Sequence, residues 1–334
     1  MKHAGRGFFP LDERWGLTRS VYSPVCARQM VWLAGAASSY ELASEIFERI
    51  GHRQMPTSSI WRQVAHHGER LRAYIEHQQA LVSVERVKLP AAWEDHDQRK
   101  GVSIDGGMVH IREEGWKEFK AGTVFDIVMR PERDPLTGEW AEQAGADRIH
   151  YVAVLGDVQR FSPALWAAAV AADIPRAAES SLTADGAAWI WNVAADLFPD
   201  SVQIVDWYHA CEHLALASQA LYPADKDAAD RWYRRCKNHL FQGEVFLIIR
   251  ALLQADLPDH ARYFQTHHRR MQYHQFQDDG FPIGSGSVES GIKQFKARMT
   301  GPGMRWSRPA AERMLAIRGA VLDGSFNSLW EKAA

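Results

Sequence analysis

The chain has 334 residues, of which 46% are hydrophobic and 24% charged, and its 39 Lys+Arg against 41 Asp+Glu leave a formal net charge of -2. These values exclude wholesale disorder, and the length suggests two domains. A net charge near zero argues against binding nucleic acid through bulk charge alone, although a local basic surface is compatible with it. The distant cysteines Cys26, Cys211 and Cys236 predict neither a disulfide framework nor a zinc site, and we expect a cytoplasmic protein with no membrane segment.

Residues 1–90 are predicted to be helical. Apolar residues recur at helical spacing over 25–33 and 40–50, and a third helix restarts near Pro56. Helix, short turn, helix is the outline of a DNA-binding helix-turn-helix, and the alternative is an ordinary helical hairpin. The polar stretch 88–100 is the expected linker to the next domain.

The pattern changes after this linker, and residues 98–206 are predicted to form a mixed α/β sheet with helices on it. The expected strands are 102–104, 119–127, 151–155, 181–183 and 202–205, with helices over 163–172 and 187–197. Residues 207–280 lose the strand signal and predict an all-helical insertion. Residues 281–334 begin with a Gly/Ser/Pro loop, which leads into a helix over 288–299.

Three carboxylates stand where chemistry is expected. Asp105 and Asp185 each follow a predicted strand and precede glycine, and ligands of open α/β sheets gather at the carboxyl ends of strands. Glu289 lies in the first turn of the helix after the glycine-rich loop. Taken singly, an Asp-Gly pair is a tight turn and an acid at a helix start complements the dipole. Taken together, the three acids on separate elements predict a site for two Mg²⁺ ions, the arrangement suited to phosphoryl transfer.

A second group of chemical residues follows the last predicted strand. Asp206, His209 and His213 recur at helical spacing and form either a metal-binding face or a hydrogen-bonded cluster that fixes the helix to the sheet. We favour the structural role, because no ligand from another element is identifiable.

The C-terminal stretch from Gly291 to Arg318 is locally basic, in contrast to the neutral chain. Its cations predict contacts with a phosphate backbone, and the alternative is a solvated helix face. The residues expected to bind DNA are Lys293, Lys296, Arg298, Arg305 and Arg308. Trp306, between two of these arginines, is expected either to stack on a base or to belong to the core.

Several of these blocks resemble, in order, the DDE transposases of bacterial insertion sequences, specifically the ISKra type of the Mutator-related group. The matching blocks are Ser103–Gly107, Gly115–Lys120, Thr183–Ile190, Asp206–His209, Ile283–Ser290 and Arg298–Ser307. The resemblance implies an RNase H-like catalytic domain with a helical insertion, preceded by an all-helical N-terminal region. It implies Asp105 on the first strand, Asp185 after the fourth and Glu289 on the final helix, together binding Mg²⁺ or Mn²⁺. It also implies that Asp206 and His209 are accessory, because they match the Cys/Asp-x-x-His signature of this group.

The function that the resemblance implies is metal-dependent cleavage and strand transfer at the ends of an insertion sequence. The partners would be DNA, as element ends and target, and further copies of the chain in a homo-oligomer on that DNA, associated with the bacterial nucleoid. Relatives begin with a longer N-terminal region, so the alternative is a truncated or domesticated copy that binds DNA without cutting it. A small-molecule metal hydrolase acting through Asp206, His209 and His213 is a third class, which the arginine-rich flank disfavours.

Overall fold

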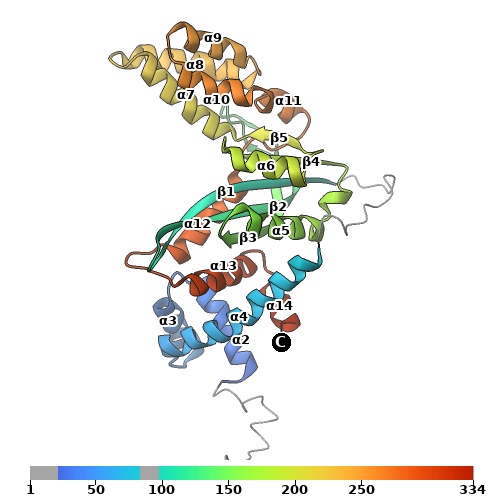
Figure 1. Cartoon of the computed structure of the whole chain (residues 1–334), viewed down its shortest axis with the longest axis vertical. Helices are drawn as coiled ribbons and strands as arrows, with labels where there is room; N and C mark the ends of the chain where they lie inside the picture. Colours follow the sequence, from blue (N-terminus) through green and yellow to red (C-terminus); the bar gives the residue numbers. More distant parts are fainter. Residues whose placement is uncertain (1–21, 83–97, 334) are drawn as a thin grey trace, which may run out of the picture. The chain divides into compact units, whose positions relative to one another are not determined.

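The computed structural model describes residues 22–82 and 98–333 (Figure 1). These residues divide into two compact units. The helical unit comprises residues 22–77, 109–117 and 295–333, and the sheet unit comprises 78–82, 98–108 and 118–294. Most of the linker expected at 88–100 lies outside the described residues, and Arg99 and Lys100 already belong to the first strand. The stretch 281–334, which we expected to belong wholly to the sheet domain, divides between the two units near residue 295.

The helical unit contains the N-terminal helices and the end of the chain. Its helices are α2 (Pro24–Ala36), α3 (Tyr40–Gly51), α4 (Thr57–Leu81, as far as His77), α13 (Arg308–Leu322) and α14 (Phe326–Lys332). Ser39 caps α3 by accepting a hydrogen bond from the amide of Leu42, and His52 ends that helix in the left-handed conformation. Helix α2 packs on α13, and the Arg318 guanidinium donates to the carbonyl of Gly35. The predicted helices are therefore confirmed, and a DNA-binding role for α3 and α4 stays a prediction.

The sheet has five strands in the order β3-β2-β1-β4-β5. The strands are β1 (Arg99–Ile111), β2 (Gly115–Arg133), β3 (Trp140–Leu155), β4 (Glu179–Ala184) and β5 (Val202–Val205). Strands β1, β4 and β5 pair in parallel, whereas β2 and β3 pair antiparallel, so the sheet is mixed, as predicted. Strand β1 is much longer than the predicted 102–104, because it continues past its pairing with β4.

Both faces of the central sheet are covered by helices. A Cβ added to Gly122 in β2 would point at Phe161 and Leu165 of α5. The adjacent Thr123 lies against Gly291 of α12 on the opposite face. The helices beside the sheet are α5 (Val158–Ala171), the short 3-10 helix η2 (Ile174–Arg176), α6 (Ala188–Leu197) and α12 (Gly286–Met299, as far as Gln294). Because both faces of β2 are covered, its residues are buried in succession, and the alternation of buried and exposed residues expected along 119–127 is wrong.

Polar side chains of β2 are buried as a result. Lys120 and Asp126 are 7% and 8% exposed, and Asp126 pairs with Lys100 and Arg148. The register of β2 against β3 shifts between Val124 and Asp126, which adds an irregularity to this strand.

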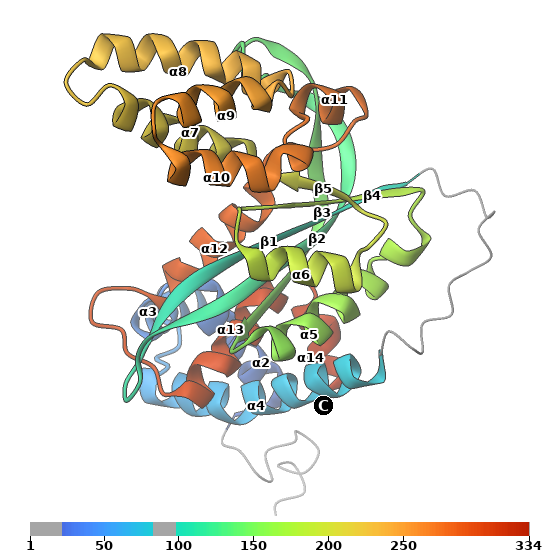
Figure 2. The same cartoon turned by 45° about the horizontal axis from the view of Figure 1, so that its top comes forward.

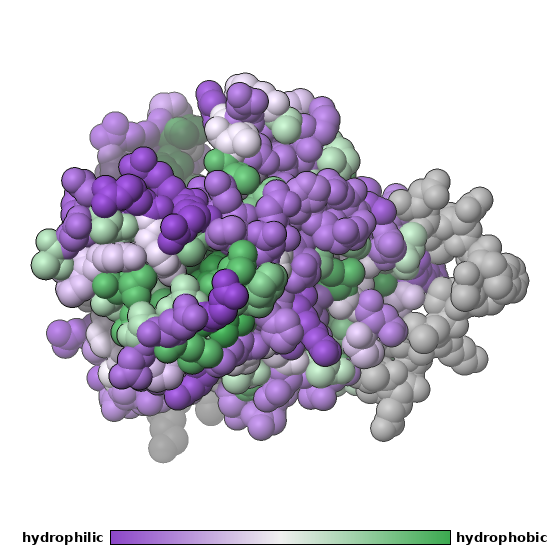
Figure 3. All heavy atoms as spheres, turned by 90° about the horizontal axis from the view of Figure 1, so that it is seen from above, coloured by the Kyte–Doolittle hydropathy of each residue, from purple (hydrophilic) through white to green (hydrophobic). Residues whose placement is uncertain are grey.

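The predicted helical insertion follows β5 and forms a bundle beside the sheet (Figure 2). It contains α7 (Trp207–Leu221), α8 (Lys226–Phe241), α9 (Val245–Gln254), α10 (Pro258–His267), the 3-10 helix η3 (His268–Arg270) and α11 (Tyr273–Asp278). Figure 3 shows a largely hydrophilic surface interrupted by small hydrophobic patches. Apolar side chains of the insertion that are exposed include Leu216, Phe246 and Leu253.

Candidate functional site

Three aspartates lie at one level of the parallel strands: Asp105 is inside β1, just past its pairing with β4, and Asp185 and Asp206 directly follow β4 and β5. In the strand register, Ile104 of β1 lies opposite Ala184 of β4, and Ala184 lies opposite Val205 of β5. The next residues are Asp105, Asp185 and Asp206. Because neighbouring residues of in-register parallel strands point to the same face, we expect their side chains to lie on one face near the carboxyl ends of β4 and β5.

The loop before α12 is tied to this edge by hydrogen bonds. The Thr183 hydroxyl donates to the carbonyl of Pro282 over 3.2 Å, and the amide of Trp207 donates to the carbonyl of Ile283 over 2.9 Å. Helix α12 then begins at Gly286 and places Glu289 beside the aspartates. The glycine-rich loop and the helix that starts two residues earlier than predicted thus bring a distant segment to the strand ends.

Asp206 is buried, and both of its carboxylate oxygens accept hydrogen bonds. Oδ1 accepts from the amide of His209 over 2.8 Å and contacts His209 Nδ1 at 3.1 Å, so that Asp206 is the N-cap of α7. Oδ2 accepts from the amide of Ser285 and from the Ser285 hydroxyl, the latter over 2.8 Å. Burial opposes ionisation, but these hydrogen bonds outweigh it and lower the pKa of Asp206. The hydrogen bond with Asp206 raises the pKa of His209 to about 9 despite burial.

The other three carboxylates have fewer hydrogen bonds. Asp105 Oδ1 accepts from the amide of Gly106, and Asp185 Oδ1 accepts from the amide of Ala187. Glu289 Oε1 lies 3.2 Å from the Ser285 hydroxyl, as the alternative acceptor to Asp206 for its single hydrogen. Burial raises the pKa of Asp105, and the charges of Asp185 and Glu289 raise it further. The negative charges of Asp185 and Glu289 therefore lie close enough to Asp105 to disfavour ionisation of Asp105, an electrostatic condition that a bound cation relieves.

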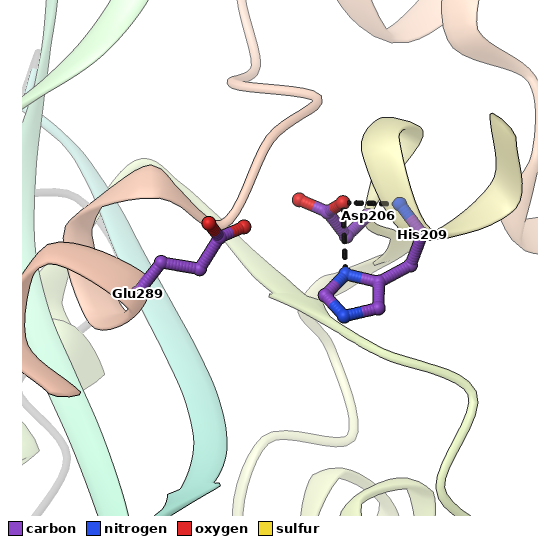
Figure 4. Close-up of side chains that lie close together, drawn as sticks. All are labelled: Asp206, His209 and Glu289. Carbon is purple, nitrogen blue, oxygen red and sulfur yellow. Dashed lines mark hydrogen bonds and ion pairs between the residues drawn. The ribbon is translucent and has the colours of Figure 1, made fainter. Parts of the chain in front are cut away.

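Among the described residues, one set of three potential ligands brings its ligand atoms together, and Asp105 and Asp185 are not part of it. Potential ligand atoms of Asp206, His209 and Glu289 lie within 4.8 Å of one another (Figure 4). The four lone-pair positions of Asp206 are, however, already occupied by hydrogen-bond donors, and its side chain is 0% exposed. Asp105, Asp185 and Glu289 provide oxygens that are still available, which are the hard donors that Mg²⁺ and Mn²⁺ prefer. The hydrogen bonds of Asp206 connect the start of α7 to the Ser285 loop, a contact that spacing in the sequence did not reveal.

His213 does not join this group of acids. Its ring stacks on that of Tyr263, with centroids 3.6 Å apart and planes 16° apart, and burial lowers its pKa. The stripe expected from Asp206 through His213 thus divides, because Asp206 caps the helix at its start and His213 packs within the bundle.

A groove of about 400 Å³ lies beside Glu289. Its lining includes Arg130 and Arg133 from β2, Tyr208 from α7, and Gly286 and Ser290 from the first turn of α12. A side chain at Gly286 would meet no atom within 4 Å, so the start of α12 is open on this side. Glu132 also lines the groove and pairs with Arg130, so Arg133 and the helix N-terminus are the features that favour a negatively charged ligand here. Spacing in the sequence did not predict Arg130 or Arg133, because they lie on a strand remote from every acid motif.

The predicted DNA-binding cations have different surroundings. Lys293 is exposed in the sheet unit, 4.0 Å from Glu289, while Lys296 and Arg305 are exposed in the helical unit. Arg308 donates two hydrogen bonds to Glu114.

Two residues of the predicted patch are not at the surface. Arg298 is 1% exposed and cannot contact a backbone there, which corrects our expectation. Trp306 is 7% exposed, and its Nε1 donates to the carbonyl of Met299, so it belongs to the core.

No protein-family model matches the chain, and no curated protein matches it significantly. Within residues 22–82 and 98–333, no helix has the length and apolar character needed to cross a membrane.

Proposed function

We propose that the protein is a DNA transposase of the DDE type, which uses Asp105, Asp185 and Glu289 to hold divalent metal for cleavage and strand transfer. The observation that carries the proposal is the register of the strand ends, which sets Asp105 and Asp185 side by side while α12 adds Glu289. The strand order and the helical insertion before α12 support an RNase H-like domain. The motif resemblance supplies the reaction class.

The oxygens of the three acids fit Mg²⁺ or Mn²⁺ by donor type. Such ions stabilise the attacking and leaving oxygens of a phosphoryl transfer. Asp206 holds the first turn of α7 and the Ser285 loop, and Ser285 in turn contacts Glu289 at 3.2 Å. Arg133 supplies positive charge along the groove, where a DNA backbone would lie, whereas Arg130 is paired with Glu132.

The test is a nicking assay on DNA that spans the ends of the element, with Mg²⁺ or Mn²⁺ added. Asp105→Asn, Asp185→Asn and Glu289→Gln each abolish nicking but leave DNA binding intact. The control is Asp200→Asn, an exposed aspartate after α6, which cuts like the wild type. Full nicking by Asp185→Asn would show that our second acid is wrong.

The same experiment separates an active enzyme from a DNA-binding derivative. A wild-type chain that shifts element-end DNA in a gel but never nicks it contradicts catalysis and supports the derivative.

A further inference from the structure

The helical unit contains a pocket of its own. Its volume is about 360 Å³, near the lower end of the range of about 300–1,000 Å³ that is typical of small-ligand sites. Every residue that lines it belongs to the helical unit. Those used below are Tyr40, Trp61, Arg112, Arg298, Arg305 and Trp306.

Arg298 forms the buried base of this pocket. Its guanidinium lies over the ring of Tyr40 at 4.7 Å and over that of Trp306 at 5.1 Å, and its Nε donates to the carbonyl of Ala34. Its Nη2 is buried, with no hydrogen-bond partner among residues 22–82 and 98–333. Because this nitrogen is buried, Arg298 adds positive potential beneath the pocket, and the groups that can contact a ligand directly are those exposed on its wall.

The surroundings of the pocket also favour an anion. Arg112 and Arg305 are exposed on its wall, and the amide ends of α3 and α13 open onto it through Ser39 and Ser307. Three guanidinium groups and two helix N-termini add positive potential, against one carboxylate in the lining, that of Glu41.

An apolar surface adjoins these cations. Trp61 lies in the lining with half of its surface exposed, whereas the Trp306 ring is buried. An exposed indole beside arginines matches the two parts of a nucleotide, because a base stacks on the ring and a phosphate binds the guanidinium groups.

We propose that this pocket binds one unpaired nucleotide of a single DNA strand, with the base against Trp61 and the phosphate at Arg305 and Arg112. The identification of the strand as DNA rests on the proposed function, whereas the site itself does not. In a double helix the base is paired and its faces are stacked, so occupation of the pocket requires a flipped or frayed end.

The experiment measures binding of a fluorescent oligothymidylate by anisotropy, using the full-length chain with Asp105→Asn and a chelator so that no cleavage occurs. The probe binds, and Trp61→Leu weakens binding about tenfold or more, whereas Trp61→Phe keeps most of the affinity. Arg305→Gln weakens binding and lowers the salt slope by about one. The matched control is Trp32→Leu, a partly exposed tryptophan outside the pocket, which binds like the wild type.

Base-free oligonucleotide of the same length separates the two halves of the proposal. It binds the wild type more weakly than oligothymidylate does, and Trp61→Leu leaves its affinity unchanged. Equal affinities of the wild type for both probes would overturn the base site, and unchanged oligothymidylate binding in both Trp61→Leu and Arg305→Gln would overturn the pocket. Failure of the nicking assay does not affect this readout, which uses neither metal nor cleavage.

Discussion

The acids of the sheet unit and the arginines of the helical unit contain incompletely paired charges of opposite sign. Asp105 has a raised pKa among other acids, whereas the Arg298 guanidinium has a buried nitrogen without a partner in the described chain. Asp206 and Arg308 are counterexamples, since hydrogen bonds saturate the former and Glu114 pairs with the latter. The comparison distinguishes charges that are fully paired and stabilise the fold from charges that are incompletely paired within the described chain.

The most direct test of this distinction is to neutralise Asp206 and Asp105 separately and to compare the free energies of unfolding. Asp206→Asn lowers the free energy of unfolding by about 3 kcal/mol, because it removes a buried charge that accepts four contacts. Asp105→Asn leaves it unchanged or raises it by up to about 1 kcal/mol, because repulsion from Asp185 and Glu289 is relieved. Urea unfolding measures both, and destabilisation by Asp105→Asn equal to that by Asp206→Asn would remove the contrast.

Arg298 tests the same contrast in the helical unit. Arg298→Ala lowers the free energy of unfolding by about 2–3 kcal/mol, because the carbonyl of Ala34 loses its donor and the rings of Tyr40 and Trp306 lose the group between them. Arg305→Ala, an exposed arginine on the same pocket, changes it by less than about 0.5 kcal/mol. Thermal or urea denaturation distinguishes the two, and similar losses would mean that Arg305 also supports the fold.

The packing of α2 on α13 tests how tightly the helices of the helical unit are held together. A Cβ added at Gly35 would lie 2.6 Å from Cγ2 of Ile317, so Gly35→Ala lowers the free energy of unfolding by about 1–2 kcal/mol. Gly51→Ala is the matched control at another helix end, where the nearest atom is 3.7 Å away. There we expect no loss, or a gain of about 0.5–1 kcal/mol from helix propensity, by urea denaturation. A neutral Gly35→Ala would show that the two helices separate easily.

The smallest expected effect is a pH dependence in the helical unit. Burial, followed by the charges of His66 and Arg70, lowers the pKa of His67 to about 4. The unfolded chain therefore binds more protons than the folded chain between about pH 6.5 and 4, and stability falls as the pH drops through this window. Solvent screening keeps the effect below about 1 kcal/mol.

His67→Gln removes this part of the pH dependence, and His77→Gln, on the exposed side of the same helix, does not. Unfolding measured at both ends of the window decides between them. Parallel pH profiles for the wild type and His67→Gln would contradict the assignment.

The sequence predicted most elements because their signals are local. Helix caps such as Ser39 and the β-branched run of β5 depend on neighbours within a few residues, and both are found in the structure. The length of β1 was underestimated, because its continuation past Ile104 depends on contacts that are remote in the sequence. The burial of Lys120 and Asp126 was missed for the same reason, since helices on both faces override the alternation of the strand.

At the candidate site, local sequence patterns were enough to identify the residue types: three acids near strand and helix ends, and an Asp-x-x-His pair after the last strand. These patterns could not identify which of Asp185 and Asp206 is the second acid, because both follow a strand and precede a helix. The structure adds what local patterns lacked: the Ser285 loop hydrogen-bonds to Asp206, whereas Asp105, Asp185 and Glu289 accept fewer hydrogen bonds, which favours Asp185 in the proposed site. Hydrogen bonds between segments about 80 residues apart depend on the fold, and no local pattern specifies them.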